Sequence, residues 1–495
     1  MVNISTAQPP MLWSRCYGGS GSESGYSIRQ TSDGGFVVAG YTSSNDGDVS
    51  GNHGANDYWI IKTDDNGVLQ WQECLGGTGY EEAFSVKQTD DKGFIIAGYT
   101  SSNDGDVTGN HGSYDFWVVK LDSSGAMEWQ KTLGGSGDDL GYGVRNVVVE
   151  QCSDGGYFVS GGTSSNDGDV SGNHGDYDYW LAKLDPLGNI IWQKCYGGSL
   201  EERFKDMRLT QDGGTIMAGW SYSNDGDLVG LNFFSYPGSW IVKTDSLGAI
   251  QWQLNYLCID TMDPTCSGRM FVSSICQTPS GQYIAGNALS WFNNHSEYST
   301  TTINLVGQIM SNAPLIGDPD HYYFPNTINS TSNGEFVLTG CKDSNWSMYI
   351  VHSQWTYSWG QPSFLGQAAY ETIETNDGGF AIVGDEDIDT SCDLNFWDQL
   401  YIIKLGGVVS VEQHEKTELS LFLDNQNLTM TYDSKINGKL KLVICDASGR
   451  KVFSSDADTQ VGFNKKQIPL YNLSKGVYFV SMMGERTYMN AKFIR

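Results

Sequence analysis

The sequence predicts an all-β protein, with a seven-bladed β-propeller in residues 11–407 and a small β-sandwich at the C-terminus. Three observations lead to this prediction. A motif of five residues, SNDGD, recurs every 58 to 63 residues. Each repeat unit contains four short apolar segments separated by clusters of Asp, Asn and Gly. The last unit lacks its fourth segment, and the chain begins with an unmatched one.

Each repeat unit is predicted to form one four-stranded antiparallel sheet. In the first unit the four segments are residues 26–31, 35–42, 57–64 and 68–77. Glycine in the connections SDGG and DDNG supplies the positive φ angle that hairpin turns need. Four units are clear, and the second segment recurs in weaker form at residues 281–288, 334–341 and 379–386. Seven such sheets in tandem indicate a propeller, because one sheet cannot bury both faces without neighbours.

The two ends of the repeat predict how the ring closes. The last unit stops after residues 400–407, LYIIKLGG, with only three strands. Residues 11–19, MLWSRCYGG, match the fourth segment of the first unit, LQWQECLGG. The N-terminal strand is therefore expected to complete the seventh blade and to lock the ring.

The composition excludes several kinds of partner. The formal net charge is −29, whereas nucleic acid and anionic membrane surfaces bind basic proteins. No stretch approaches the ~18 consecutive apolar residues of a membrane-spanning helix. Residues 1–10, MVNISTAQPP, lack the charged and apolar regions of a whole signal peptide. We expect them to be a disordered start or the remnant of a signal peptide, with maturation near Ala7.

The chain has ten cysteines, which an exported protein can pair. Cys16, Cys74 and Cys195 occupy the same repeat position and should lie in different blades, as buried free thiols. Cys258 and Cys266 are the best candidates for a local disulfide.

One loop is repeated almost letter for letter. Residues 43–54, SSNDGDVSGNHG, return at 101–112 and 164–175, between the second and third strands of three blades. Oxygen-bearing side chains stand at loop positions 1, 3, 5 and 12, with Gly at position 6, which is the register of an EF-hand calcium loop. The predicted calcium ligands are Asp46, Asp48, Ser50 and Asp57, then Asp104, Asp106, Thr108 and Asp115, then Asp167, Asp169, Ser171 and Asp178.

The alternative is a loop held by its own Asx turns without a metal. Position 12 is Asp rather than Glu, so any calcium affinity should be modest. The fourth copy has Val229 and Tyr236 at positions 5 and 12, and no site is expected there. His53, His111 and His174 lie in separate blades, which makes a poor transition-metal site, so we expect them to be structural or solvent-facing.

A second pattern concerns the innermost strand of each blade. Basic residues follow a buried aliphatic residue in the first four units, and the equivalent residues later differ: Arg29, Lys87, Arg145 and Arg208, then Cys276, Asn329 and Glu374. An acid lies six residues before each basic residue: Glu23, Glu81, Asp139 and Glu202. The pattern fits a positive channel for an anionic ligand. It also fits acid–base pairing around the ring, which the register favours.

Aromatic side chains and one irregular segment are further candidates for binding. Residues 57–59, 115–117 and 178–180 could stack on sugars, but the rings of such strands usually pack between blades, so a core role is favoured. Residues 287–327 break the repeat and carry Trp291, His295, His321, Tyr322 and Tyr323. An asymmetric site is expected there if the protein is an enzyme. The sequence holds no nucleophile elbow, phosphate loop or His-based zinc motif, so no catalytic or cofactor-binding residue is assigned.

The repeat ends at residue 407, and residues 408–417 are predicted to be a linker. Residues 418–495 are again rich in short apolar strands, as expected for a small sandwich. The stretches LKLVICDASGRKV, IPLYNLSKGVYFVSM and AKFIR closely resemble the type A C-terminal sorting domain of the Bacteroidetes type IX secretion system. Matching positions are Asp446, Gly449, Arg450, Leu473, Gly476, Val477, Tyr478 and Lys492. The family usually ends in Lys, and Arg495 keeps that charge.

The resemblance implies export through the outer membrane by the type IX machinery, which would act on residues 418–495. The expected location is the outer cell surface or the medium. The expected function is that of a binding or scaffold propeller, stabilised by calcium, monomeric, with a glycan or a surface protein as ligand. The alternative is a polysaccharide-active enzyme, a lyase or hydrolase, with a site near residues 287–327. The nearly identical loops favour binding or stability, because catalysis usually needs one asymmetric constellation.

Overall fold

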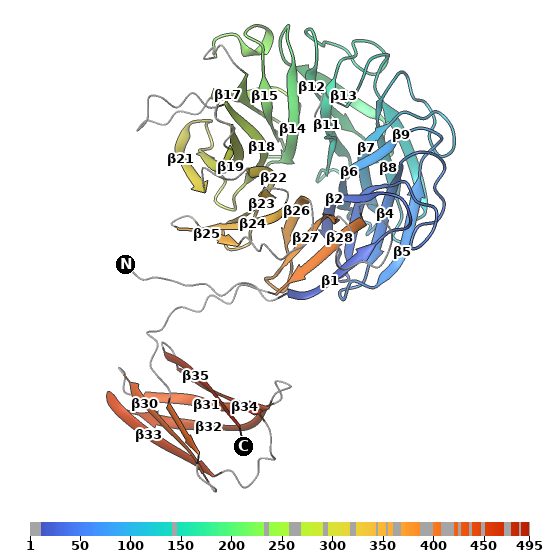
Figure 1. Cartoon of the computed structure of the whole chain (residues 1–495). Coiled ribbons are helices and arrows are strands. Elements are labelled where there is room, and N and C mark those ends of the chain that lie inside the picture. The colour runs from blue at the N-terminus through green and yellow to red at the C-terminus, as the bar shows by residue number, and fades with distance from the viewer. Residues whose placement is uncertain are drawn as a thin grey trace. The chain divides into compact units, whose positions relative to one another are not determined.

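The computed structural model describes most of the chain. The described residues are 11–140, 146–231, 237–256, 269–290, 296–316, 323–342, 345–352, 355–359, 368–386, 399–406, 420–423, 427–434, 438–446, 451–469, 477–484 and 487–494. Two compact units result (Figure 1): one is Pro10–Gly407 and the other contains Val408–Arg495. Among the described residues no helix is long and apolar enough to cross a membrane.

The first unit is a β-propeller of seven four-stranded sheets, which confirms the predicted fold. The first blade is β2 (Glu23–Gln30), β3 (Phe36–Thr42), β4 (Asp57–Thr63) and β5 (Leu69–Leu75). The second is β6 (Glu81–Gln88), β7 (Phe94–Thr100), β8 (Asp115–Leu121) and β9 (Met127–Leu133). The third is β10 (Val148–Gln151), β11 (Tyr157–Thr163), β12 (Asp178–Leu184) and β13 (Ile190–Tyr196). The fourth is β14 (Glu202–Leu209), β15 (Thr215–Ser221), β16 (Gly238–Thr244) and β17 (Ile250–Tyr256), with the short helix η1 (Gly226–Leu228).

The last three blades carry the weaker repeats. The fifth is β18 (Arg269–Gln277), β19 (Tyr283–Ser290), β20 (Ser296–Ile303) and β21 (Ile309–Ile316). The sixth is β22 (Tyr323–Ser330), β23 (Phe336–Lys342), β24 (Asn345–His352) and β25 (Trp355–Trp359). The seventh is β26 (Ala368–Glu374), β27 (Phe380–Glu386), β28 (Gln399–Leu405) and the N-terminal strand β1 (Met11–Tyr17). Because β1 pairs antiparallel with β28, the predicted closure of the ring is confirmed.

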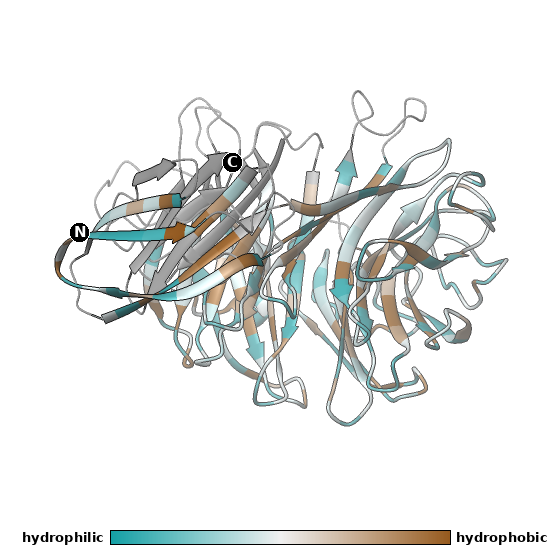
Figure 2. Cartoon of the chain, turned by 90° about the horizontal axis from the view of Figure 1, so that it is seen from below, coloured by the Kyte–Doolittle hydropathy of each residue, from teal (hydrophilic) through white to brown (hydrophobic). Residues whose placement is uncertain are grey.

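The hydrophobic core lies between neighbouring blades, where the sheets pack face to face. The strands carry the hydrophobic residues (Figure 2). Tyr58 and Trp59 are fully buried, as are their equivalents Phe116, Trp117, Tyr179 and Trp180. The ring of Tyr58 lies 4.5 Å from that of Trp117 in the next blade. These rings therefore belong to the core, as expected, and are not available to stack on a sugar.

The first strand of each blade lies nearest the axis, and these seven strands contact one another around the ring. The last residue of the first strand in one blade accepts a hydrogen bond from the preceding blade. The donor is a backbone N–H in the turn that follows the first strand of that preceding blade. Ser32 N donates to Gln88 Oε1 at 2.8 Å, and Asn376 N of the last blade donates to Gln30 Oε1 of the first at 2.7 Å. The ring is therefore joined by hydrogen bonds as well as by apolar contacts.

The cysteines agree in part with the expectation. Cys74 and Cys195 are buried free thiols, as predicted. Cys16 is disulfide-bonded, which corrects the prediction that it is free. The prediction rested on the position of Cys16 in the repeat alone. Cys16 differs from Cys74 and Cys195 because it lies in β1, the strand that closes the ring. The predicted pair Cys258 and Cys266 lies outside the described residues.

The C-terminal unit consists of two sheets around a core of its own. One sheet contains β29 (Ser420–Leu423), β30 (Asn427–Ser434) and β33 (Gly462–Pro469). The other contains β31 (Gly438–Asp446), β32 (Lys451–Thr459), β34 (Val477–Gly484) and β35 (Thr487–Ile494). Leu428 and Met430 of the first sheet pack with Leu440 and Leu442 of the second. This is the small sandwich that the sequence predicts.

Candidate functional site

The repeated loops lie next to the links between blades. Asp46 Oδ1 accepts a hydrogen bond from Ser20 N at 2.7 Å, and Asp48 Oδ2 accepts one from Gly18 N at 3.3 Å. The same two bonds recur at Asp104 and Asp106, at Asp167 and Asp169, and at Asp225 and Asp227. We call these eight aspartates the link clamp, because each pair holds a loop to the link that precedes its blade.

The other predicted calcium ligands have different partners. Ser50 accepts a hydrogen bond from Gln72 on the outer strand, and Asp57 binds His53. Within the described part of the chain, no group of three or more His, Cys, Asp or Glu side chains is placed to hold a metal ion. The predicted ligands Asp46, Asp48 and Asp57 are thus not brought together as one oxygen cage. Calcium binding itself stays a prediction of the sequence.

The fourth loop separates the two explanations of the repeated aspartates. Its predicted position 5 is Val229, which is 70% exposed, yet Asp225 and Asp227 keep the clamp. The clamp therefore does not depend on the rest of the calcium register. It gives a structural reason for the repetition, since the links that the loops contact are repeated as well.

Removing the clamp charges should distinguish the two explanations. The double change Asp46→Asn with Asp48→Asn weakens two charge-assisted hydrogen bonds, and we expect a loss of about 1–2 kcal/mol in the free energy of unfolding. Asp225→Asn with Asp227→Asn is the matched control. The clamp predicts equal losses for both variants in chelator. A rise in melting temperature with calcium that is smaller in the first variant than in the wild type and in the control would establish a calcium site in this loop instead.

Position 12 of each loop belongs to a buried pair of carboxyl groups. Asp57 is fully buried; its Oδ2 accepts a hydrogen bond from His53 N at 2.8 Å and lies within hydrogen-bond distance, 2.7 Å, of His53 Nδ1. Its Oδ1 is buried and has no hydrogen-bond partner among the described residues. A Cβ atom on Gly76 would lie 2.8 Å from Asp57 Oδ1 and 2.7 Å from Glu81 Oε2. The two carboxyl groups therefore face the same glycine.

The pair recurs at two more blade junctions. Asp115 and Asp178 each have a buried Oδ1 without a partner among the described residues, and they approach Asp139 and Glu202 beside Gly134 and Gly197. Burial raises the pKa of Asp178 to about 6 and that of Glu202 to about 7, although hydrogen bonds to each oppose this change. We call these three sets the carboxyl pairs.

The junction between the last and first blades shows how such a pair can be satisfied. Gln399 occupies the position of Asp57, at the start of the third strand of its blade. Its Nε2 donates to Glu23 Oε2 at 3.1 Å and to Gly19 O at 3.0 Å. An amide donor thus stands where three other junctions have the carboxyl group of Asp57, Asp115 or Asp178. One proton on each carboxyl pair would supply the same hydrogen bond.

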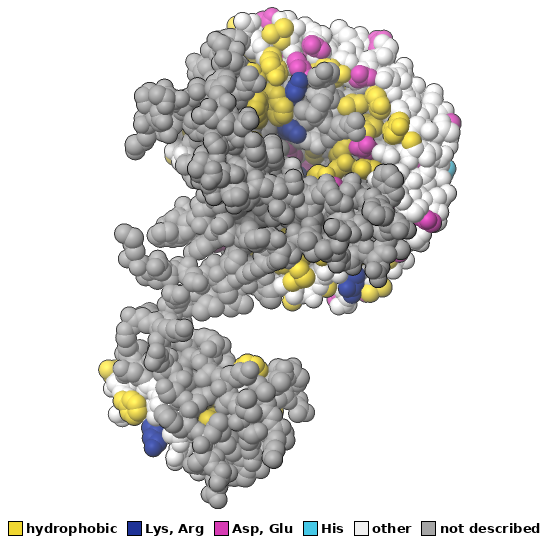
Figure 3. Space-filling model, viewed as in Figure 1, with side chains coloured by type: hydrophobic (Ala, Val, Ile, Leu, Met, Phe, Trp, Pro, Cys, Tyr) yellow, Lys and Arg dark blue, Asp and Glu magenta, His cyan; other side chains and the backbone are white. Residues whose placement is uncertain are grey.

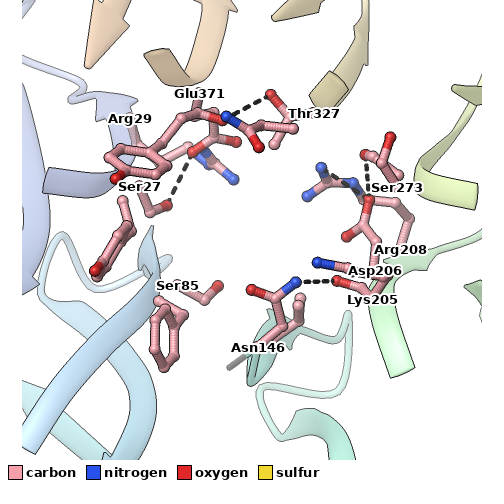
Figure 4. Close-up of a pocket in the computed structure, with 16 residues that line it drawn as sticks. Ser27, Arg29, Ser85, Asn146, Lys205, Asp206, Arg208, Ser273, Thr327 and Glu371 are labelled. Carbon is pink, nitrogen blue, oxygen red and sulfur yellow. Dashed lines mark hydrogen bonds and ion pairs between the residues drawn. The ribbon is translucent and has the colours of Figure 1, made fainter. Parts of the chain in front are cut away.

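The inner strands enclose a cavity of about 290 Å³ on the axis of the ring (Figure 4). Two rings of side chains line it, with one residue from each blade. The first ring is Tyr26, Phe84, Asn146, Lys205, Ser273, Asn326 and Tyr370. The second ring is Ser27, Ser85, Val148, Asp206, Ser274, Thr327 and Glu371. Arg29 and Arg208 also line it, and both continue into a more open pocket of about 780 Å³.

Local backbone geometry turns the first ring toward the axis. In six of the seven inner strands the pairing register shifts at this residue, so that it is a bulge. A β-bulge leaves one residue unpaired and redirects its side chain. The bulged residues include Tyr26, Lys205 and Tyr370, and sequence reasoning missed all of them. Comparing the repeat units three residues before Arg29 would have found this position.

The second ring joins the blades. Ser27 Oγ accepts a hydrogen bond from Val86 N of the next blade at 3.3 Å. Glu371 Oε2 accepts one from Ile28 N at 3.1 Å, and Asp206 Oδ2 accepts one from Ile275 N at 3.1 Å. These two carboxylates therefore serve as acceptors between blades.

The basic residues of the channel are paired with acids, as the favoured interpretation predicted, but with different acids. Arg29 bonds Glu371 at 2.6 Å, Lys87 bonds Glu150 at 2.7 Å, and Arg208 lies 3.3 Å from Asp206. The acids six residues upstream do not take part in these pairs. Glu23, for example, accepts hydrogen bonds from Thr42 and from Ser44 at the loop face.

Two assignments of channel position were also wrong. The strand register places Glu150 at the position of Arg29 in the third blade, and Ile373 in the seventh. The sequence interpretation placed Arg145 and Glu374 there. Arg145 lies outside the described residues, and Glu374 instead accepts hydrogen bonds from the backbone and the side chain of Ser332. In the third and seventh blades, the aliphatic residue used to align the repeat units does not occupy the same strand position as in the other blades.

The pKa values of the two carboxyl groups are shifted in opposite directions. Burial by itself would raise the pKa of Glu371, but Arg29, Arg208 and Lys87 lower it to about 2. A carboxyl group with so low a pKa is ionised at neutral pH and cannot donate a proton as a general acid. Burial raises the pKa of Asp206, but its Oδ2 already contacts Ser274, Ile275 and Arg208.

The segment 287–327, where an enzyme site was expected, lies only partly within the described residues. Asn287 is buried in β19 and bonds the strand beside it. The side chains of Trp291, His295, His321, Tyr322 and Tyr323 lie outside the part of the chain whose side chains are described. The asymmetric constellation that the structure does describe is the central cavity.

The sequence matches one family model, described as the secretion system C-terminal sorting domain, over residues 424–495. No curated protein matches the chain. Among solved structures, a protein of unknown function from Bacteroides caccae is 10% identical, with 72% of this chain and 97% of that chain covered and a TM-score of 0.35. A protein of unknown function from Dyadobacter fermentans is 8% identical, with coverages of 80% and 99% and a TM-score of 0.44.

A puromycin hydrolase is 10% identical, with 87% of this chain and 62% of that chain covered and a TM-score of 0.47. At these identities and TM-scores, the assignment of the fold rests on the strand pairing of the chain itself.

Proposed function

We propose that this chain, a propeller protein exported through a type IX C-terminal sorting domain, is a binding module whose ligand enters the central cavity. The sorting domain directs the protein to the outer surface of the cell or to the extracellular space. A ligand in that location is an extracellular small molecule or the end of a glycan chain.

One observation carries this proposal: the two cavity rings differ from blade to blade, whereas the loops of the first three blades are nearly identical. Aromatic side chains from adjacent blades line one arc, with Tyr26 5.1 Å from Phe84 and 4.8 Å from Tyr370 between ring centroids. Lys205, Ser273 and Asn326 line the opposite arc. An apolar face opposite a few polar groups is typical of ligand pockets. The symmetric outer loops serve stability in this account.

The proposal predicts that filling the cavity blocks binding. Ser273 is a bulged residue that lines the cavity (Figure 4), and among the described residues its hydroxyl bonds only Gly286 O. Ser273→Trp should therefore abolish binding of every glycan that the full chain retains on an array of neutral and acidic glycans. Leu187→Trp, at a turn where Leu187 is 66% exposed, is the control and should bind as the wild type does. Undiminished binding by a folded Ser273→Trp variant would place the ligand elsewhere.

A further inference from the structure

We propose that the ligand of the central cavity is a small acidic sugar, a hexuronate or a chain end that carries one, whose carboxylate binds Lys205. This inference rests on the proposed function and specifies its ligand class.

Lys205 is a cation without a counter-ion among the residues that the structure describes. It is the bulged residue of β14, and Figure 4 shows its amine directed into the cavity. Among the described residues its Nζ makes no ion pair or hydrogen bond, and its one described contact is with the Trp220 ring, 5.7 Å to the centroid. Neighbouring cations are engaged: Arg203 bonds Glu201 at 2.8 Å, and Arg208 lies beside Asp206. Within the described part of the chain, this half-buried ammonium group therefore lacks the acidic partner that such groups normally have.

The charges around the cavity leave an excess of positive charge. Arg29, Lys205 and Arg208 line it against two acids, Asp206 and Glu371. The local balance is therefore +1 in a chain whose net charge is −29. A second donor is also unused, because Arg208 Nε is buried without a hydrogen-bond partner among the described residues. Both observations favour an anionic group in the cavity over a neutral or cationic one.

Lys and Arg side chains border hydrophobic ones near the middle of the propeller face (Figure 3). The arc of Tyr26, Phe84 and Tyr370 offers an apolar surface to the face of a ring. Ser85, Ser273 and Asn326 offer hydroxyl and amide groups for the edge of a ligand that carries hydroxyls. A volume of about 290 Å³ holds one such ring rather than an oligomer. A sugar ring with one carboxylate combines these three properties.

The titration of Lys205 gives the inference a distinctive signature. Burial, and to a smaller extent the nearby Arg203, lower the pKa of Lys205 to about 8. Asp206, Arg208, Arg29 and Glu371 are the other charged groups that line the cavity. The carboxylate needs the ammonium form, so affinity should fall about tenfold between about pH 7 and about pH 9. Arginine stays charged over this range, so a Lys205→Arg variant should keep its affinity.

The experiment titrates the full chain with D-glucuronate and with D-glucose, which has the same ring without the carboxylate, by calorimetry. We expect glucuronate to bind at least about tenfold more tightly at about pH 7, and Lys205→Met to remove that preference. Lys194→Met is the matched control, because Lys194 also lies over a tryptophan ring but on an outer strand. It should bind as the wild type does. The pH series on wild type and Lys205→Arg follows on the same samples.

Two results would overturn the inference. Equal affinity for the two sugars would remove the anion preference while leaving the cavity as a binding site. No binding of glucuronate would remove the ligand class, and the Ser273→Trp array experiment then shows separately whether the proposed function survives. A preference for glucuronate that Lys205→Met does not change, in a folded variant, would place the carboxylate elsewhere and would also contradict the inference.

Discussion

Deleting residues 1–17 is expected to abolish cooperative unfolding of the propeller, because β1 is the strand that closes the ring. Without it, β28 becomes an exposed edge, and the last blade loses its outer strand. Two contacts to the first blade are also lost, since Tyr17 Oη donates to Gly67 O at 2.5 Å and Trp13 Nε1 donates to Asp65 O at 3.0 Å.

Urea unfolding followed by tryptophan fluorescence measures this effect. A chain that lacks only residues 1–10 is the control and should unfold as the full chain does. Adding a synthetic peptide of residues 8–20 to the shorter chain should restore a cooperative transition. The Cys16→Ser variant measures the contribution of the disulfide separately, and we expect that contribution to the free energy of unfolding to be about 2–4 kcal/mol. An unchanged transition midpoint after removal of residues 1–17 would show that the ring is held closed by other means.

Replacing Asp178 with Asn is expected to stabilise the protein at neutral pH, by a few kcal/mol. The amide would donate to Glu202 as the Gln399 amide donates to Glu23, while its oxygen would still accept from His174. The substitution therefore replaces a titrating hydrogen bond with a permanent one. Most substitutions at fully buried polar positions destabilise, so this direction is a stringent test.

The pH dependence of the stability predicts the direction of this effect independently. Burial raises the pKa of both Asp178 and Glu202 in the folded state, to about 6 and about 7. A raised pKa of an acid means that the folded state holds the proton more tightly than the unfolded state does. This contribution to stability is present below the unfolded pKa and is lost as the pH rises through the folded pKa. We expect the loss between about pH 4 and about pH 7, where each tenfold difference in proton affinity between the two states corresponds to about 1.4 kcal/mol.

The matched control is Asp167→Asn, which changes an exposed clamp residue of the same blade. Thermal unfolding at a series of pH values should give Asp178→Asn a shallower decline than the wild type above pH 4, and Asp167→Asn an unaltered slope. The claim that the carboxyl pair holds a proton would be contradicted by a wild type whose stability does not fall in this range. It would also be contradicted by an Asp178→Asn variant that is less stable at every pH.

The fold could be predicted because the repeat shows where each strand begins and ends and how the strands follow one another. Four segments per unit, hairpin glycines and the unmatched strand at residues 11–19 together leave one way to close the ring. The residues of the buried core followed from the same pattern: Trp59 and its equivalents lie between blades, as expected. The sandwich followed from the short apolar strands after residue 417.

The site could not be predicted in the same way. The calcium register describes the loop as one unit, but the structure divides its aspartates between the link before the blade and the junction after it. The cavity depends on bulges, each of which shifts one residue of an inner strand. These bulged residues differ from one repeat unit to the next, so a search for similar positions in the repeat does not find them. Lys205 was missed for this reason, and Glu150 was missed because the third inner strand has a different register.

The most direct test of the central claim is a crystal structure of the full chain soaked with D-glucuronate. We predict ligand density within the central cavity, with the carboxylate against Lys205 Nζ and the sugar ring beside Tyr26 and Tyr370. Density on the loop face or near residues 287–327, or an empty cavity at concentrations that saturate binding in solution, would contradict the account.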